Sequence, residues 1–76
     1  MEKYRVIRNS KVIWLDCHHT RFIVTPTNIG YQEIQTQILQ ISCIFCKKTN
    51  YIYRKHFFEI IAKKVFTIEE RYKIVI

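Results

Sequence analysis

The sequence predicts an α+β fold: a three-stranded antiparallel meander packed against two or three helices. Two patterns lead to this prediction. Over the first 25 residues, short runs alternate polar and apolar side chains, which is typical of strands. Beyond residue 30, apolar side chains recur every three or four positions, which is typical of amphipathic helices. One glycine and one proline among 76 residues leave only short connections, so we expect a single small basic domain over residues 1–76.

The meander is expected at residues 3–8, 11–16 and 21–25. The first run is followed by Asn9-Ser10, a two-residue turn signal between strands. The second and third runs are rich in β-branched and aromatic side chains and are apolar on both faces. Such strands are usually covered on both sides, so we expect helices on one face and a partner chain on the other. Four side chains make up this expected interaction surface: Val12, Trp14, Phe22 and Val24.

The helices are expected at residues 29–46, 51–66 and 68–75. The first follows the capping side chains of Pro26-Thr27-Asn28. Its apolar stripe has spacings of three, four, three and four: Tyr31, Ile34, Ile38, Ile41 and Phe45. A strand over residues 34–43 is the alternative, because isoleucine and threonine there alternate with glutamine. For the last segment, a helix capped by Thr67-Ile68-Glu69-Glu70 and a closing strand are equal alternatives.

The charge of the chain favours an anionic partner. Thirteen Lys and Arg against six Asp and Glu give a net charge of +7, which attracts nucleic acid or a larger acidic protein. Hydrophobic residues make up 49% of the chain, more than so short a chain buries easily, so we also expect a homo-oligomer or a heteromeric complex. No apolar run reaches the roughly 18 residues of a membrane span, and we expect no membrane partner.

The cysteine count and the overall composition bear on where the protein works. Three cysteines, an odd number, fit a reducing compartment better than a disulfide scaffold. The expected location is therefore the cytoplasm, inside a host cell. The abundance of isoleucine, lysine, tyrosine and asparagine is typical of AT-rich genomes, and it associates the chain with small viral or phage-like regulators.

Basic and aromatic residues interleave in the second half of the chain. Lysine and arginine neutralise phosphates, and exposed aromatic rings stack on bases. The expected nucleic-acid-binding residues are Lys47, Lys48, Arg54, Lys55, Tyr51 and Tyr53. A solvated polar surface is the alternative, because the basic residues between positions 54 and 64 are spread around the expected helix.

The cysteines and histidines point to a metal site. Cys43 and Cys46 have the C-x-x-C spacing, and tetrahedral zinc needs two further ligands, which residues 17–19 can supply. The expected ligands of a structural zinc are Cys17, His19, Cys43 and Cys46. His18 and His56 are the alternative histidine ligands. Free thiols in or near the core are the alternative to any metal site.

These segments also resemble parts of two known families. If residues 34–43 form a strand, the two cysteine segments become knuckles, an arrangement similar to a zinc ribbon, with Lys47 where that family commonly has glycine. Residues 39–49, together with Asp16 and a histidine at 18 or 19, resemble an HNH nuclease. That resemblance implies a histidine general base and a divalent metal that steadies the scissile phosphate. Lys47 again departs from the family pattern, which has histidine or asparagine there.

Taken together, the sequence predicts a small intracellular binding protein and no enzyme. The first expectation is a regulator that associates with nucleic acid and carries a structural zinc. The alternative is a protein–protein interaction module or inhibitor that docks on a larger host or viral protein, or self-assembles. A degenerate HNH-like metal-dependent nuclease is the remote alternative.

Overall fold

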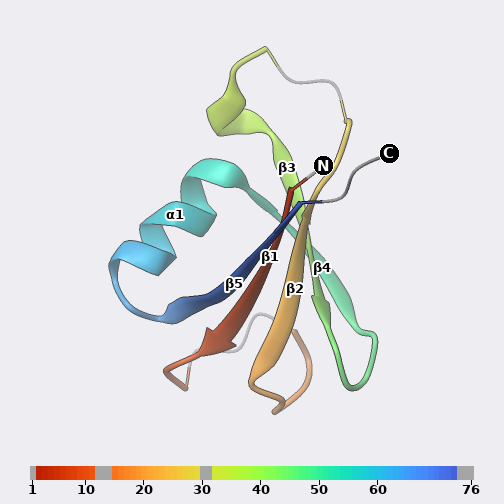
Figure 1. The fold of residues 1–76 in the computed structure, drawn as a ribbon, viewed down its shortest axis with the longest axis vertical. Helices are drawn as coiled ribbons and strands as arrows, with labels where there is room; N and C mark the ends of the chain where they lie inside the picture. Colours follow the sequence, from red (N-terminus) through yellow and green to blue (C-terminus); the bar gives the residue numbers. More distant parts are fainter. Residues whose placement is uncertain (1, 12–14, 30–31, 74–76) are drawn as a thin grey trace.

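The computed structural model describes residues 2–11, 15–29 and 32–73. These residues form five β-strands, one α-helix and one 3-10 turn (Figure 1). In chain order the elements are β1 (Glu2–Arg8), β2 (Arg21–Pro26), η1 (Ile34–Thr36), β3 (Ile38–Cys43), β4 (Thr49–Tyr53), α1 (Arg54–Ala62) and β5 (Phe66–Lys73). No helix in this part of the chain is long and apolar enough to cross a membrane.

The five strands form one antiparallel sheet in the order β4-β3-β2-β1-β5. The strands β4 and β5 therefore lie at opposite edges of the sheet as the structure describes it. Helix α1 connects these two strands and lies against one face of the sheet (Figure 1). On the other face the outward residues of β3 are only partly buried, and β4, at the edge of the sheet as described, is mostly exposed.

The core lies between α1 and the sheet. Its buried side chains form one cluster: Tyr4, Val6, Leu15, Phe22, Val24, Leu39, Ile41, Cys43, Phe57 and Phe66. Burial alternates along β3, and the register places Ile41 opposite Val24 and Cys43 opposite Phe22, so neighbouring strands extend the same apolar layer. Phe57 is the buried residue of α1, and its ring centroid lies 5.7 Å from that of Tyr4.

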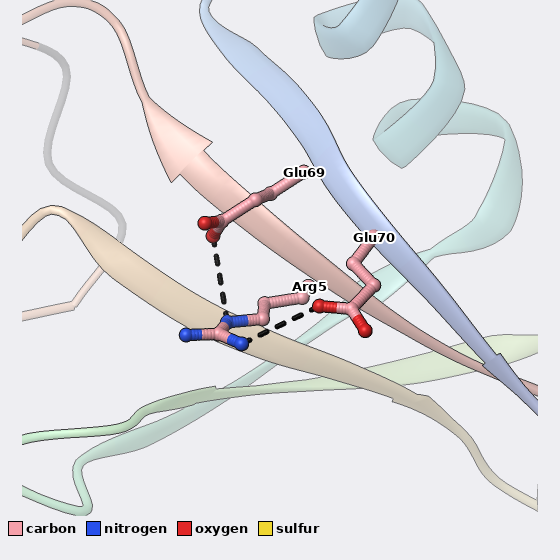
Figure 2. Close-up of polar contacts among 3 residues, drawn as sticks. All are labelled: Arg5, Glu69 and Glu70. Carbon is pink, nitrogen blue, oxygen red and sulfur yellow. Dashed lines mark hydrogen bonds and ion pairs between the residues drawn. The ribbon is translucent and has the colours of Figure 1, made fainter.

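Two ion pairs join β1 to the edge strand β5 (Figure 2). Arg5 Nε lies 3.4 Å from Glu69 Oε2, and Arg5 Nη1 lies 3.4 Å from Glu70 Oε2. The register opposes Arg5 to Glu70 and Val6 to Ile68, so Glu69 is the extra residue of a β-bulge. The bulge brings two successive carboxylates to one guanidinium. Partly exposed pairs of this kind contribute only about 0–1 kcal/mol each, but they neutralise the charge of Arg5.

The predicted fold class is wrong, because the structure has a five-stranded sheet and a single helix in its described part. In the described part of the helix expected over residues 29–46, the chain forms η1 and β3, so the strand alternative for residues 34–43 is correct only from residue 38 onward. From Ile38 to Cys43 the sequence also alternates with period two, and this pattern buries Leu39, which the helical stripe left out. The β-branched isoleucines fit a pleated strand better than a helix.

Three further elements differ from the expectation. Of the strand expected over residues 11–16, residues 12–14 lie outside the described part, and the remaining residues form bends; β1 pairs directly with β2. Of the helix expected over residues 68–75, residues 68–73 belong to the strand β5, as in the strand alternative, and residues 74 and 75 lie outside the described part; β5 supplies hydrogen-bond partners along β1. Within the helix expected over residues 51–66, α1 begins only at Arg54, because residues 49–53 pair with β3.

Candidate metal centre

The turn between β3 and β4 folds tightly around Cys43. The Lys47 N–H donates to the Cys43 carbonyl (3.2 Å), and the Cys43 N–H donates to the Lys48 carbonyl (2.9 Å). Lys47 has a φ of 60°, the left-handed conformation that glycine adopts most easily. The Phe45 N–H also donates to the Cys43 sulfur (3.4 Å). The backbone of the turn therefore donates a hydrogen bond to the buried sulfur of Cys43, as expected of a metal-binding knuckle.

Residues 15–19 form the second part of the site. Leu15 is buried in the core, and the Cys17 N–H donates to the Leu15 carbonyl (2.6 Å), so the chain turns sharply at this point. Lys48 Nζ lies 2.5 Å from the Asp16 carbonyl oxygen and 3.4 Å from the Asp16 carboxylate, and it links the two turns. Both turns lie at the same end of the sheet (Figure 1).

The two turns bring four ligand-type side chains together: Cys17, His19, Cys43 and Cys46. Their three sulfurs and one imidazole nitrogen all lie within 4.8 Å of one another. In a tetrahedral zinc site with Zn–S distances of about 2.3 Å, the ligand atoms are about 3.5–3.8 Å apart. Small side-chain rotations would close this difference. The cluster can therefore hold a metal ion, and it consists of the four ligands that the sequence predicted.

The sulfurs of the cluster influence one another's protonation. Burial raises the pKa of the Cys17 thiol, and its interactions with the thiols of Cys43 and Cys46 raise it further. The His19 N–H lowers this pKa but does not cancel the rise, so the pKa of Cys17 lies above the ordinary 9.0. Burial also raises the pKa of Cys43, but N–H groups of Cys46 and Phe45 point at its sulfur and outweigh burial, so its pKa lies below 9.0. Cys43 is thus the thiol of this pair that ionises more readily, and a bound cation would favour thiolates throughout the cluster.

The other two histidines lie outside the cluster. The His18 carbonyl accepts a hydrogen bond from Arg8 Nη2 (3.0 Å), and the His18 side chain is exposed. His56 is on α1, where its Nδ1 lies 3.7 Å from Glu59 Oε2. The geometry therefore favours His19 over both alternative ligands.

The expected nucleic-acid-binding residues lie along β4 and at its two ends. Tyr51 and Tyr53 are exposed on the strand, at 58% and 52%. Lys47 and Lys48 immediately precede the strand, and two basic residues follow it at the start of α1: Arg54 and Lys55. Arg54 is partly engaged, because its guanidinium carbon lies 5.4 Å from the centroid of the Phe58 ring.

The structure describes two of the four residues of the expected interaction surface, and neither of them lies at the surface of the molecule. Phe22 and Val24 are 2% and 0% exposed and belong to the core of the chain. Their strand, β2, is covered on its core side within the same molecule, so these side chains are not available to a partner. Val12 and Trp14 lie outside the described residues.

Sequence reasoning missed two features of the site region. The Phe45 ring packs against the His19 ring, with centroids 5.1 Å apart, although Phe45 was expected on the stripe of a helix. Ile38 and Gln40 lie directly opposite Tyr53 and Tyr51 on the neighbouring strand. The alternation of residues 38–43 could have placed Ile38 and Gln40 on one face of a strand, but the contact of Phe45 and the register with β4 depend on tertiary structure.

Comparisons with protein-family models, with curated proteins and with solved structures found no match to this chain. Its class therefore follows from its own geometry. It is a small α+β protein with an antiparallel sheet and a Cys₃His cluster that can hold a metal ion.

Proposed function

We propose that this chain is a nucleic-acid-binding protein whose fold is held together by a structural Zn²⁺. The observation that carries the proposal is the convergence of Cys17, His19, Cys43 and Cys46, whose ligand atoms lie within 4.8 Å of one another. Three thiolates and one imidazole are a ligand set of structural zinc sites, and soft sulfur ligands disfavour magnesium and calcium.

The position of the cluster supports a structural role. One turn belongs to the connection between β1 and β2, and the other to the hairpin between β3 and β4. Lys48 and Asp16 link these turns only through exposed groups, which stabilise little by themselves. A zinc ion bound by both turns would add its binding free energy to folding, because the unfolded chain does not hold the four ligands together.

A zinc ion held by all four side chains would be structural and not catalytic. Four protein ligands fill a tetrahedral zinc, whereas catalytic sites keep one position for water or substrate. In this arrangement His19 is a ligand, so of the two histidines that the nuclease resemblance offered as general base only His18 stays free of the metal. The three thiols must stay reduced to bind zinc, so the proposal includes a reducing compartment such as the cytoplasm.

The charge distribution favours nucleic acid as the partner. The chain carries a net charge of +7, and the segment from Lys47 to Lys55 contains four basic residues, two exposed tyrosines and no acidic residue. Arg5 is a weaker candidate for phosphate, because two glutamates already face it (Figure 2). The β4 edge is therefore the favoured contact surface.

The zinc part of the proposal is tested by metal content. We expect one zinc per chain in the purified protein, and His19→Ala should bind zinc at least about tenfold more weakly, because it removes one ligand. His18→Ala is the matched control, since His18 is the exposed neighbour outside the cluster. Equal zinc content and affinity in the two variants would contradict the assignment.

The nucleic-acid part is tested by salt dependence. A labelled single-stranded oligonucleotide should bind at low salt, and its affinity should fall steeply as salt rises, because each neutralised phosphate releases counterions. Absence of binding to DNA and to RNA at low salt would refute this part and leave the zinc site standing.

An acidic protein partner is the second candidate function, and one surface feature favours it. A shallow groove of about 490 Å³ lies between η1 and α1; its lining includes exposed Ile34 and Phe58, two cations and one carboxylate: Arg54, Lys55 and Glu59. Apolar side chains flanked by cations suit a segment that alternates acidic and apolar residues. Substitution of Ile34 by serine should weaken such a partner and leave oligonucleotide binding unchanged.

A further inference from the structure

A hollow of about 240 Å³ lies on β4 between two exposed tyrosines. It is lined by Ile38, Tyr51, Ile52 and Tyr53. Tyr51 and Tyr53 are 58% and 52% exposed. The hollow therefore combines an apolar floor with two exposed aromatic walls.

The spacing of the two walls matches a planar ring. Residues two apart on a strand share a face and lie about 6.6–6.8 Å apart. Stacked nucleobases are about 3.4 Å apart, so one base inserted between the tyrosine rings would stack on both. Tyr53 also has an aromatic neighbour on α1, because its ring centroid lies 6.3 Å from that of His56.

The neighbouring strand adds a polar group beside the hollow. Gln40 lies directly opposite Tyr51, and Ile38 lies directly opposite Tyr53. Gln40 is half-buried, and the register places it on the same face of the sheet as Tyr51, next to the residues that line the hollow. An amide that offers both a donor and an acceptor can hydrogen-bond the edge of a base.

Charges at both ends of β4 suit the backbone of a nucleic acid. Lys47 precedes the strand and Lys55 follows it, both exposed. The five residues of β4 span about 17 Å, which places cations on each side of the hollow. Phosphates that flank a bound base would therefore meet positive charge in either direction along the strand.

We propose that this hollow binds one base of a single-stranded nucleic acid between Tyr51 and Tyr53, with Lys47 and Lys55 neutralising the flanking phosphates. This inference rests on the proposed nucleic-acid function and names the site of contact. A single strand fits better than a duplex, because each face of a duplex base is already stacked on its neighbours. Stacking between aromatic side chains tolerates every base, so the site is expected to bind with little sequence preference.

The test compares Tyr51→Ala and Tyr53→Ala with Tyr51→Phe and Tyr53→Phe. The probes are a labelled 15-mer of deoxythymidylate and an abasic 15-mer with the same phosphates, measured by fluorescence anisotropy at low salt. Each alanine variant should bind the thymidylate strand about 5- to 150-fold more weakly, and each phenylalanine variant should bind within about threefold of the unchanged protein. Ile34→Ala is the control, because Ile34 is equally exposed and lies outside the hollow.

A salt titration separates stacking from charge. The tyrosine variants should leave the slope of log affinity against log salt unchanged, whereas Lys47→Ala and Lys55→Ala should each reduce it by about 0.7. A folding defect would not change the affinity alone in the tyrosine variants and the salt slope in the lysine variants. The unchanged protein should also prefer the thymidylate strand to the abasic strand.

Each negative outcome has a distinct meaning. If the abasic strand binds as tightly as the thymidylate strand, or the alanine variants bind normally, the base site is refuted while nucleic-acid association survives. If the unchanged protein binds neither strand at low salt, both the site and the proposed nucleic-acid function are refuted.

Discussion

Two lysines occupy left-handed backbone conformations at turns on which the architecture depends. Lys47 (φ 60°) lies in the turn that carries Cys43 and Cys46, and Lys64 (φ 61°) lies between α1 and β5. For a residue with a Cβ atom this conformation costs roughly 1–2 kcal/mol. Glycine would avoid the cost, so each turn is formed against a local preference that the surrounding hydrogen bonds must overcome.

Lys64→Gly is therefore expected to stabilise the protein. The relief of backbone strain should outweigh the greater flexibility of the unfolded chain and raise the free energy of unfolding by about 0.5–1 kcal/mol. Lys63→Gly is the matched control. Lys63 has a φ of −80°, so glycine relieves no strain there and should lower the free energy of unfolding by about the same amount. Urea denaturation measures both, and a loss of stability in Lys64→Gly would show that its side chain matters more than its backbone.

At the scale of elements, Phe57 is the most deeply buried attachment of α1 to the sheet, with Ile60 and Ile61 packed beside it. Phe57 is 1% exposed and packs against Tyr4, whereas its neighbour Phe58 touches Tyr4 with the edge of a ring that stays 40% exposed. The helix spans Arg54–Ala62, too short to be stable alone in water, so its conformation depends on this packing. Because α1 also connects the two edges of the sheet, its attachment affects the placement of both β4 and β5.

Phe57→Ala should consequently lower the free energy of unfolding by about 3–5 kcal/mol, since it leaves a cavity under the helix. Phe58→Ala removes the same atoms from an exposed position and should cost only about 1 kcal/mol. Thermal and urea denaturation of the two variants measure the difference. Similar losses in both would mean that the exposed ring packs more tightly in solution than its 40% exposure indicates.

The sequence predicted some elements well and others poorly, for physical reasons that can be named. The strands at residues 3–8 and 21–25 closely match β1 and β2, because alternation there has no helical competitor. Residues 38–43 fit both the helical spacing of three to four residues and the strand period of two. Only their pairing with β2 selects the strand. Such pairing is a tertiary effect that local patterns do not contain.

The candidate metal centre was more predictable than the fold. The C-x-x-C spacing and the Cys-His-His segment named the four residues of the cluster, with His18 and His56 as alternatives to His19, even though the turn was expected inside a helix. Chemical type and spacing survive an error in secondary structure, because a turn and a helix both bring residues three apart close together. The hollow beside Ile38 was not predictable in the same way, since it requires the register between β3 and β4.

At the scale of the whole molecule, the cluster joins two segments that are distant in sequence. Leu15 belongs to the core, and the connection between β1 and β2 that carries it is also fixed at its ends, where the Arg8 N–H donates to the Thr20 carbonyl (2.7 Å). A small chain buries a small core, and small domains commonly need a metal or another cross-link for stability. A zinc ion at Cys17 and Cys43 would supply that cross-link across the lower end of the sheet in Figure 1.

Removal of zinc is therefore expected to destabilise the protein without abolishing the sheet at once. Zinc that binds only the folded chain stabilises it by mass action, about 2.7 kcal/mol when free zinc is about 100-fold above the dissociation constant, so a strong chelator should lower Tm by roughly 10–20 °C. Hydrogen exchange should rise first at residues 15–20 and 44–48, because the two turns separate before β1 and β5 do. His19→Ala serves as the control, since a variant that no longer holds zinc firmly should respond much less to the chelator. If the chelator removes zinc and Tm does not change, packing and the Lys48–Asp16 contact suffice to hold the turns together.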